Sequence, residues 1–299
     1  MQTTNSLLGC LLCRGENFRP DYKRVTAVRS IFDCACLALS ATVTSQIFTD
    51  VKKSLHLHDC VVKAYPPDRR NIFMEVARRG TLVADRDLAW VVAGLRTTKH
   101  HFDKTLIYGR SINCVTELYA WMLGELRDDA YVTNDDGRQR MVAMYHAHLS
   151  DDLQRHIMSE FKKADSTIRV VISTVAFGIG VEIADIRQVV HWGRLSSLMT
   201  YWQEVGRAGR DGASSRAVWY CNATAAGNDS VLKQLATSNA CLRKTLLEGF
   251  VIPEMDVSRL HELAARRPCD DQCQDCACDF CTCCSYCRRE CICSQQHDV

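Results

Sequence analysis

The chain of 299 residues is long enough for two domains, and its 47% hydrophobic and 24% charged content is ordinary for a soluble globular protein. No apolar run approaches the roughly 20 residues of a membrane span, and the N-terminus lacks the basic region of a signal peptide, which disfavours membrane and secreted proteins. Residues 269–299 hold six acidic residues and two arginines, which gives this segment a charge of −4. Because the whole chain has a net charge of +2, the remaining residues carry +6. A basic remainder is compatible with a nucleic-acid partner.

Two segments near the start suggest ligand contacts. In GENFRPDYKRV (residues 15–25), Phe18 and Arg19 begin an alternation of rings and cations that suits stacked bases and phosphates. Entry into a helix over residues 21–32 explains these residues about as well. LALSAT (residues 37–42) predicts an apolar strand ending in Ser40 and Thr42, at the edge where open parallel sheets bind ligands. The same hydroxyls would cap a helix predicted over residues 43–55.

A domain boundary is expected near Asp68. Residues 60–65 predict a strand, and Pro66 and Pro67 predict an extended linker, since proline cannot continue a helix. We therefore expect a partial domain over residues 1–68, a complete domain over residues 69–225, and a small helical, cysteine-rich module over residues 226–299.

The middle part alternates apolar strands with amphipathic helices. Strands are predicted at residues 105–108, 130–133, 142–145, 169–173, 188–191 and 217–220, and helices at 112–126, 151–163 and 198–208. Short apolar strands between such helices predict an α/β domain with a parallel sheet covered on both faces. Two further helices are predicted at residues 230–235 and 241–250.

The segment YWQEVGRAGRDG at residues 201–212 is the most specific feature. Gln203, Arg207 and Arg210 are spaced i, i+4 and i+7, so a helix would place them on one face. Arginine presents a planar fork of donors that matches phosphate oxygens. Gly206 and Gly209 each cost a helix roughly 1 kcal/mol relative to alanine, which suggests a close approach of backbone or ligand. A solvated arginine-bearing helix is the plainer reading of the arginine spacing alone.

This string is similar to motif VI of the superfamily-2 helicases, and QEVGRAGRDG resembles the RecQ family in particular. The resemblance implies two RecA-like domains, with Arg207 and Arg210, assisted by Gln203, reaching the γ-phosphate of ATP held by the first domain. It also implies Mg²⁺ as cofactor and DNA, as single strands or duplex junctions, as partner. The activity implied is 3′→5′ unwinding in recombination and repair, in the nucleus or in a prokaryotic cytoplasm.

Other segments fit the same family in order. Residues 15–25 resemble its aromatic-rich loop, although Arg14 stands where tryptophan is usual, and LALSAT resembles motif III. DRRNI at residues 68–72 resembles the junction into the second domain. KTLIYGRS at residues 104–111 resembles motif IV, and residues 169–193 resemble motif V, with Glu182 and Ile183 as departures. The residues then expected at the DNA backbone are Arg110, Ser111 and Thr174, and those at the ATP-site loop are Gly178 and Gly180.

The cysteines indicate metal. Ten of the 18 lie in the last 31 residues, and dense cysteines in an intracellular chain favour metal over disulfides. Cys241, Cys269, Cys273 and Cys276 offer four thiolates for Zn²⁺ and resemble the RecQ zinc module, with looser spacing. Seven further tail cysteines can replace one of these, form a second site, or make a low-complexity tail.

The sequence contains no GxxxxGK[ST] phosphate loop, and Ser6-Leu7-Leu8-Gly9 stands where Asp-Glu-Ala-His is expected. One hypothesis is therefore a piece of a RecQ-type helicase that is inactive alone. The alternative is a helicase-derived module that binds DNA and zinc without hydrolysing ATP. A cysteine-rich metal buffer with a vestigial motor is a third possibility.

Overall fold

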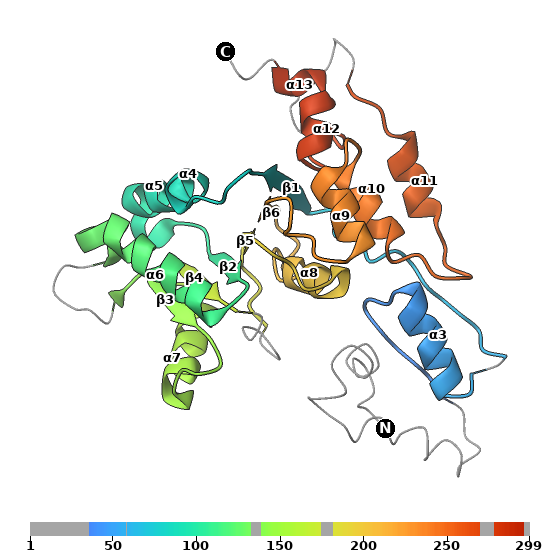
Figure 1. Ribbon diagram of the computed structural model, residues 1–299, viewed down its shortest axis with the longest axis horizontal. Helices are drawn as coiled ribbons and strands as arrows, with labels where there is room; N and C mark the ends of the chain where they lie inside the picture. The colour runs from blue at the N-terminus through green and yellow to red at the C-terminus, as the bar shows by residue number, and fades with distance from the viewer. Residues whose placement is uncertain (1–35, 58, 133–138, 175–181, 270–277, 296–299) are drawn as a thin grey trace. The chain divides into compact units, whose positions relative to one another are not determined.

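The computed structural model describes residues 36–57, 59–132, 139–174, 182–269 and 278–295 (Figure 1). The chain divides into two compact units, each described here by itself. The first unit comprises residues 1–68 and 244–266, and the second comprises residues 69–243 and 267–299. Within the described residues, no helix combines the length and apolar character needed to cross a membrane.

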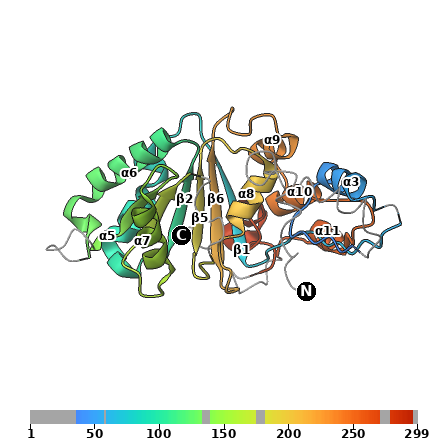
Figure 2. The same ribbon diagram turned by 90° about the horizontal axis from the view of Figure 1, so that it is seen from below.

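The second unit is built on a six-stranded parallel sheet. Its strands are β1 (Ile72–Arg78), β2 (Thr105–Gly109), β3 (Val142–Tyr145), β4 (Val170–Ser173), β5 (Gln188–Trp192) and β6 (Ser215–Cys221). Their order is β1-β6-β5-β2-β4-β3, and Figure 2 shows β2, β5, β6 and β1 side by side. All residues of β2 and β4 are buried, as strands covered on both faces must be. The predicted α/β parallel-sheet fold is confirmed.

Helices connect these strands, and one more helix, α9, follows the last strand. They are α4 (Ala84–Asp87), α5 (Ala89–Thr98), α6 (Ile112–Leu126), α7 (Asp151–Lys162), α8 (Leu198–Val205) and α9 (Ser230–Thr237), with short 3-10 turns η2 (Lys99–His101) and η3 (Arg127–Ala130). Apolar residues of α5 and α6 pack on one face of the sheet in a single core cluster with Ile107, Ile172 and Val190. Burial of such side chains contributes roughly 1.5–3 kcal/mol each and drives this packing.

The cysteine-rich C-terminal region covers an edge of the sheet. β1 is an edge strand, and its Met74 forms a bridge with Cys284 and donates a backbone hydrogen bond to the Cys283 carbonyl (3.4 Å). Arg288 of α12 (Ser285–Glu290) lies over the Phe73 ring, 4.0 Å from its centroid. An uncovered edge would expose unpaired backbone groups, so this region protects β1.

Two predicted elements of the second unit are corrected, and one strand was not predicted. The helix predicted over residues 198–208 ends at Val205. Residues 130–133 form no strand in their described part, where Tyr131 makes only an isolated bridge with Arg140. The β1 strand was not predicted, because prolines precede it and the charged Glu75 interrupts its apolar pattern. Its partner strand, β6, lies over 140 positions away in the sequence.

The first unit contains α3 (Ser45–Ser54), most of α10 (Leu242–Glu248) and α11 (Ser258–Ala265). The strands predicted over residues 37–42 and 60–65 are wrong, since residues 36–42 and 60–65 are described and form none. A strand needs neighbours to complete its backbone hydrogen bonds, and Leu37 stays 71% exposed. Arg259 of α11 instead pairs with Asp68 (2.6 Å), which fastens the segment after the two prolines.

Asp87 is a buried carboxylate that fixes the turn after β1. It accepts hydrogen bonds from Arg79 (2.7 Å), Arg86 (2.8 Å) and the Val83 backbone (3.1 Å). Burial alone would raise the Asp87 pKa, but the bonds from Arg86 and Arg79 outweigh it and lower the pKa to about 2. The charged carboxylate therefore stabilises the fold.

We expect this stabilisation to be present above the unfolded pKa of ~3.9 and lost as pH falls through about 2. Its size is about 2 kcal/mol. Thermal unfolding of the wild type and Asp87→Asn between pH 7 and pH 2 checks this. The variant should start less stable and lose less on acidification, and parallel curves would contradict the role of the charge.

Candidate functional site

The arginine loop, defined here as residues 206–212 (GRAGRDG), follows α8 and leads into β6. The helix α8 ends at Val205, so Gln203 is helical, whereas Arg207 and Arg210 lie in the turns that follow. The side chain of Gln203 is exposed. The arginines are close together: burial lowers the pKa of Arg210, and the positive charge of Arg207 lowers it further, while Glu182 acts in the opposite direction. The loop thus gathers two cations without a shared helical face.

Side chains at the start of β1 hold this loop by its carbonyl groups. The Arg69 guanidinium donates to three carbonyl oxygens, those of Gly206 (3.2 Å), Ala208 (3.1 Å) and Gly209 (2.8 Å). Asn71 Nδ2 also donates to the Gly209 carbonyl (2.8 Å). Carbonyls at a helix C-terminus lack intrahelical partners, and a cation there is favoured by the helix dipole. Arg69 and Asn71 therefore fix the loop that follows α8.

The segment before β5 holds the loop from another direction. The Gly209 amide donates to the Ile186 carbonyl (2.8 Å), and Arg187 donates to both oxygens of Asp211 (3.0 and 2.5 Å). The hydrogen bond from Arg187 lowers the Asp211 pKa, so this carboxylate stays charged at neutral pH. The loop backbone is fixed on both sides.

Gly209 is required by this arrangement. Its φ is +53°, and a Cβ added there would lie 2.4 Å from Ser215 Oγ, 2.5 Å from Asn71 Nδ2 and 2.6 Å from the Ala213 carbonyl oxygen. The sequence-based expectation of a close approach therefore holds at Gly209. Gly206 has an ordinary helical φ of −63°, and its requirement is weaker.

Arg207 lies beside a buried polar cluster between the sheet and α8. His191 Nε2 of β5 lies 2.9 Å from Glu204 Oε2 of α8, and Tyr108 of β2 stacks on His191 with ring centroids 5.2 Å apart. Burial raises the Tyr108 pKa, and the positive Arg207 acts in the opposite direction. The sequence left His191 unassigned and did not indicate Tyr108 or Glu204. The one feature of the sequence that could have indicated these residues is that each is a polar residue within a strand or helix that is otherwise mostly apolar.

The Nε atom of Arg207 is buried and has no hydrogen-bond partner among the described residues. A buried donor without a partner is costly, by about 1–3 kcal/mol, and more when the group is charged. An anion is the natural complement of a guanidinium, since its donors match carboxylate and phosphate oxygens. The position of Arg207 is therefore suited to an anionic ligand.

A second group of predicted residues lies at the carboxyl ends of neighbouring strands. Arg110 and Ser111 follow β2, and Thr174 follows β4, which pairs with β2 in parallel. Arg110 is exposed, whereas the Ser111 hydroxyl caps α6 by accepting from the Cys114 amide (3.2 Å). The structure thus brings these three residues to one edge of the sheet, with Ser111 also serving a structural role.

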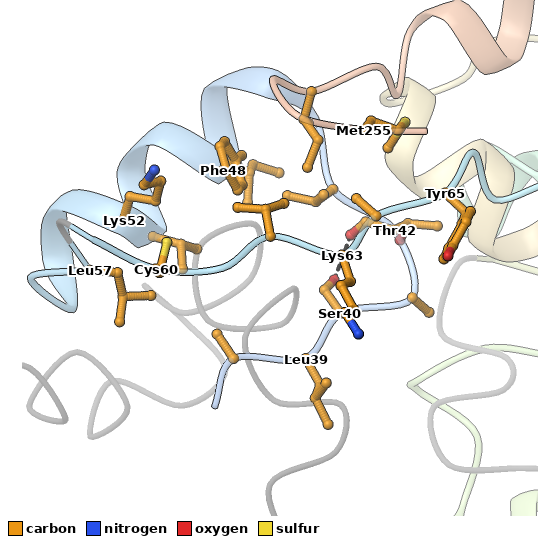
Figure 3. Close-up of a pocket in the computed structure, with 18 of the residues that line it drawn as sticks. Leu39, Ser40, Thr42, Phe48, Lys52, Leu57, Cys60, Lys63, Tyr65 and Met255 are labelled. Carbon is orange, nitrogen blue, oxygen red and sulfur yellow. Dashed lines mark hydrogen bonds between the residues drawn. The ribbon is translucent and has the colours of Figure 1, made fainter. Parts of the chain in front are cut away.

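Four other predicted residues, Phe18, Arg19, Gly178 and Gly180, lie outside the described residues. Ser40 and Thr42 line a cavity of about 380 Å³ in the first unit, and Figure 3 shows their side chains beside Lys63. Ser40 Oγ donates to the Thr42 carbonyl (2.7 Å), so this hydroxyl is engaged within its own loop.

The cysteines gather into two groups of four. The first cluster is Cys241, Cys283, Cys284 and Cys287, and the second cluster is Cys269, Cys278, Cys291 and Cys293, with the sulfur atoms of each group within 4.8 Å of one another. In the first cluster, Cys241 Sγ lies 3.6 Å from Cys283 Sγ, and Cys284 Sγ lies 3.5 Å from Cys287 Sγ. Four such donors fit a tetrahedral Zn²⁺ site.

The predicted ligand set is therefore regrouped. Cys241 and Cys269 belong to different clusters, and Cys273 and Cys276 lie outside the described residues. Sequence spacing favoured the nearest cysteines after Cys269. The fold instead brings the Cys-Cys-x2-Cys run of residues 283–287 against Cys241 at the start of α10, because both pack beside β1.

Arg243 links the first cluster to Arg69, the residue that fixes the arginine loop. It is 1% exposed, and its guanidinium donates to the carbonyl oxygens of Arg69 (2.7 Å) and Cys283 (3.3 Å), and to that of Ile72. Its position two residues after Cys241 places it between the cysteines and β1. Arg69, which fixes the arginine loop, and the cysteines that can hold a metal are thus joined through the Arg243 side chain.

Comparisons with known proteins agree with this architecture. Residues 87–212 match the family described as the helicase conserved C-terminal domain. The chain is 25% identical over 282 residues to ATP-dependent DNA helicase Q-like 2 of Arabidopsis thaliana, covering 88% of this chain and 36% of that protein. It is 31% identical over 214 residues to ATP-dependent DNA helicase Q5 of Rattus norvegicus, covering 69% of this chain and 20% of that protein.

Among solved structures, S. cerevisiae Dbp5 bound to RNA and ADP BeF3 is similar at a TM-score of 0.56 and 15% identity, over 87% of this chain and 62% of that chain. At that identity the likeness shows the fold alone. Fold and family match together define a RecA-like helicase C-terminal domain. Both relatives named above are ATP-dependent DNA helicases of the Q type, and this chain spans only 36% and 20% of their lengths.

The geometry at Gly209 predicts a specific cost. Gly209→Ala should reduce the free energy of unfolding by about 2–4 kcal/mol, because a left-handed φ and an overpacked contact act together. Gly212→Ala is the matched control, since its φ is +86° but no atom lies within 4 Å of an added Cβ. It should cost only about 1–2 kcal/mol. Denaturant unfolding measures both, and equal losses would contradict the close approach at Gly209.

Proposed function

We propose that this chain forms the second motor domain of a RecQ-type, ATP-dependent 3′→5′ DNA helicase, in which Arg207 and Arg210 bind the phosphates of ATP. Gln203, exposed on α8 just before the loop, is assigned to the same site. The phosphate loop and the Mg²⁺-binding carboxylates that this chemistry needs are not found as motifs in the 299 residues. We infer that another part of the complete protein supplies them, and that this chain alone hydrolyses no ATP.

The observation that carries the proposal is the buried Nε of Arg207, which lacks a partner among the described residues and sits in a loop fixed by Arg69 and Asn71. In phosphoryl transfer, little covalent chemistry falls to the protein, and positioned cations stabilise the charge that develops on the transferred group. A fixed backbone lets the guanidinium meet the phosphate without reorganisation. These features support a catalytic role for both arginines.

DNA binding is assigned to the carboxyl edge of the sheet. Arg110 is exposed there, with Thr174 on the neighbouring strand, and such side chains suit a phosphate backbone, which sets register without reading sequence. Phe18, Arg19, Ser40 and Thr42 are proposed as further DNA contacts, and Gly178 and Gly180 as the loop toward ATP, on the family resemblance. By the same resemblance we propose single strands and duplex junctions as substrates, roles in recombination and repair, and a nuclear location.

The first cluster is proposed to bind Zn²⁺. Cys241, Cys283, Cys284 and Cys287 would hold the ion, which when bound supplies a rigid cross-link between α10 and the C-terminal region. The chain's own contribution is to orient these thiols against β1, through Arg243 and the Met74 bridge. The role of this site is structural.

DNA-stimulated ATP hydrolysis by the complete protein, compared with Arg207→Ala and Arg210→Ala variants, tests the proposal. Loss of either arginine should lower kcat by about 10³ or more, as for an arginine that stabilises the transferred phosphoryl group, with DNA affinity retained. Arg155→Ala is the control, since Arg155 lies exposed on α7 and forms an ion pair with Asp152 on the same helix.

Unchanged turnover in both arginine variants would contradict the assignment. Turnover by the 299-residue chain alone that Arg210→Ala abolishes would show that a phosphate site exists within it, and would overturn the inference that another segment supplies that site.

A further inference from the structure

The second cluster has the geometry of a single-ion site. The sulfur atoms of Cys269, Cys278, Cys291 and Cys293 all lie within 4.8 Å of one another, and Cys278 Sγ is 3.7 Å from Cys291 Sγ. Zinc–sulfur bonds of about 2.3 Å in a tetrahedron place sulfur atoms about 3.8 Å apart. A disulfide would bring two sulfurs to about 2.05 Å, and an iron–sulfur cluster would spread its thiolates farther apart around several irons.

The backbone near Cys278 supports a thiolate. The Cys281 amide donates to Cys278 Sγ (3.2 Å), in a turn closed by the Thr282 amide, which donates to the Cys278 carbonyl (3.1 Å). A hydrogen bond from a backbone amide favours the charged form of its acceptor. Cys281 Sγ donates to the Cys278 carbonyl (3.5 Å) and does not belong to the group of four sulfur atoms that all lie within 4.8 Å of one another.

The local apolar core of this segment is small among the described residues. Its core cluster consists of buried Cys281, Cys291 and Cys293, with Cys269, Cys278 and Phe280 against them. One aromatic ring and a few thiols bury too little apolar area to offset the entropy of ordering the chain. In segments this small, a metal commonly supplies the missing free energy.

We propose that Cys269, Cys278, Cys291 and Cys293 bind a second Zn²⁺, separate from the ion of the first cluster. Binding is a ligand exchange without redox change: the four thiols lose their protons to solvent and the thiolates bind the ion. The two sites are nested in the sequence, because Cys278 and Cys291 bracket Cys283, Cys284 and Cys287. The second ion thus closes the chain loop that presents three ligands of the first, and the C-terminal region is a two-metal module.

The test is the zinc content of the intact 299-residue chain, purified without added metal or chelator, by plasma mass spectrometry. The wild type should hold two Zn²⁺ per chain. Cys293→Ser should hold one, and so should Cys287→Ser from the first cluster. Cys281→Ser is the matched control, because it is an equally buried cysteine of the same segment that the geometry excludes as a ligand, and it should keep two.

Cobalt titration keeps the test informative if a variant fails to fold. Metal-free wild type, reduced beforehand, should develop the visible bands of tetrahedral Co²⁺–thiolate sites up to two equivalents. Saturation at one equivalent would overturn the proposal, and so would one zinc per wild-type chain or two in Cys293→Ser. A wild-type mass showing a disulfide within the second cluster, with one zinc, would assign these thiols to oxidation instead.

Discussion

The three hydrogen bonds from Arg69 to the carbonyls behind α8 are the constraint on which the site depends. These acceptors lie after α8, whose last carbonyls already accept from the backbone amides that follow, so Arg69 fixes the loop rather than the helix end. In this loop the two arginines lie beside the buried cluster of Tyr108, His191 and Glu204. The side chain that fixes the loop comes from the segment just before β1, which pairs with β6.

The same junction connects the loop to the cysteine-rich region. Arg243 donates to the Arg69 carbonyl, and Cys241 lies two residues before it in the first cluster. Metal binding proposed at that cluster would therefore bear on the position of Arg69 through one buried guanidinium. Two metals in nested order would strengthen this link, since each closes a loop that includes ligands of the module.

Local sequence predicted much of the sheet but little of the site's geometry. Strands such as β2 and β4 are continuous apolar runs, and α6 has a regular amphipathic pattern, so both could be predicted without knowledge of their neighbours. The conformation of the loop after α8 could not, because Arg69 and Asn71 fix it from outside the helix. The identity of Arg207 and Arg210 as a pair came from a motif, whereas the pairing with Tyr108 depends on strand order.

The cysteines show the same limit. Their number and spacing predicted metal binding, but not which thiols share an ion, since that depends on how residues 283–287 meet Cys241 beside β1. Likewise, LALSAT has the pattern of a strand, yet residues 36–42 find no partner strand within the described residues. Pattern determines what a segment can form, and available neighbours determine whether it does.

Hydrogen exchange of the arginine loop tests the central claim most directly, by comparing wild type with Arg69→Met. The amides of Gly209 and Asp211, which bond to Ile186 and Ala184, should exchange faster in the variant, while those of β2 and β4 stay protected. Arg216→Met, which removes the Glu75 ion pair on the same strands, should leave the loop protected. Equal protection of the loop in wild type and Arg69→Met would contradict the claim that Arg69 fixes it.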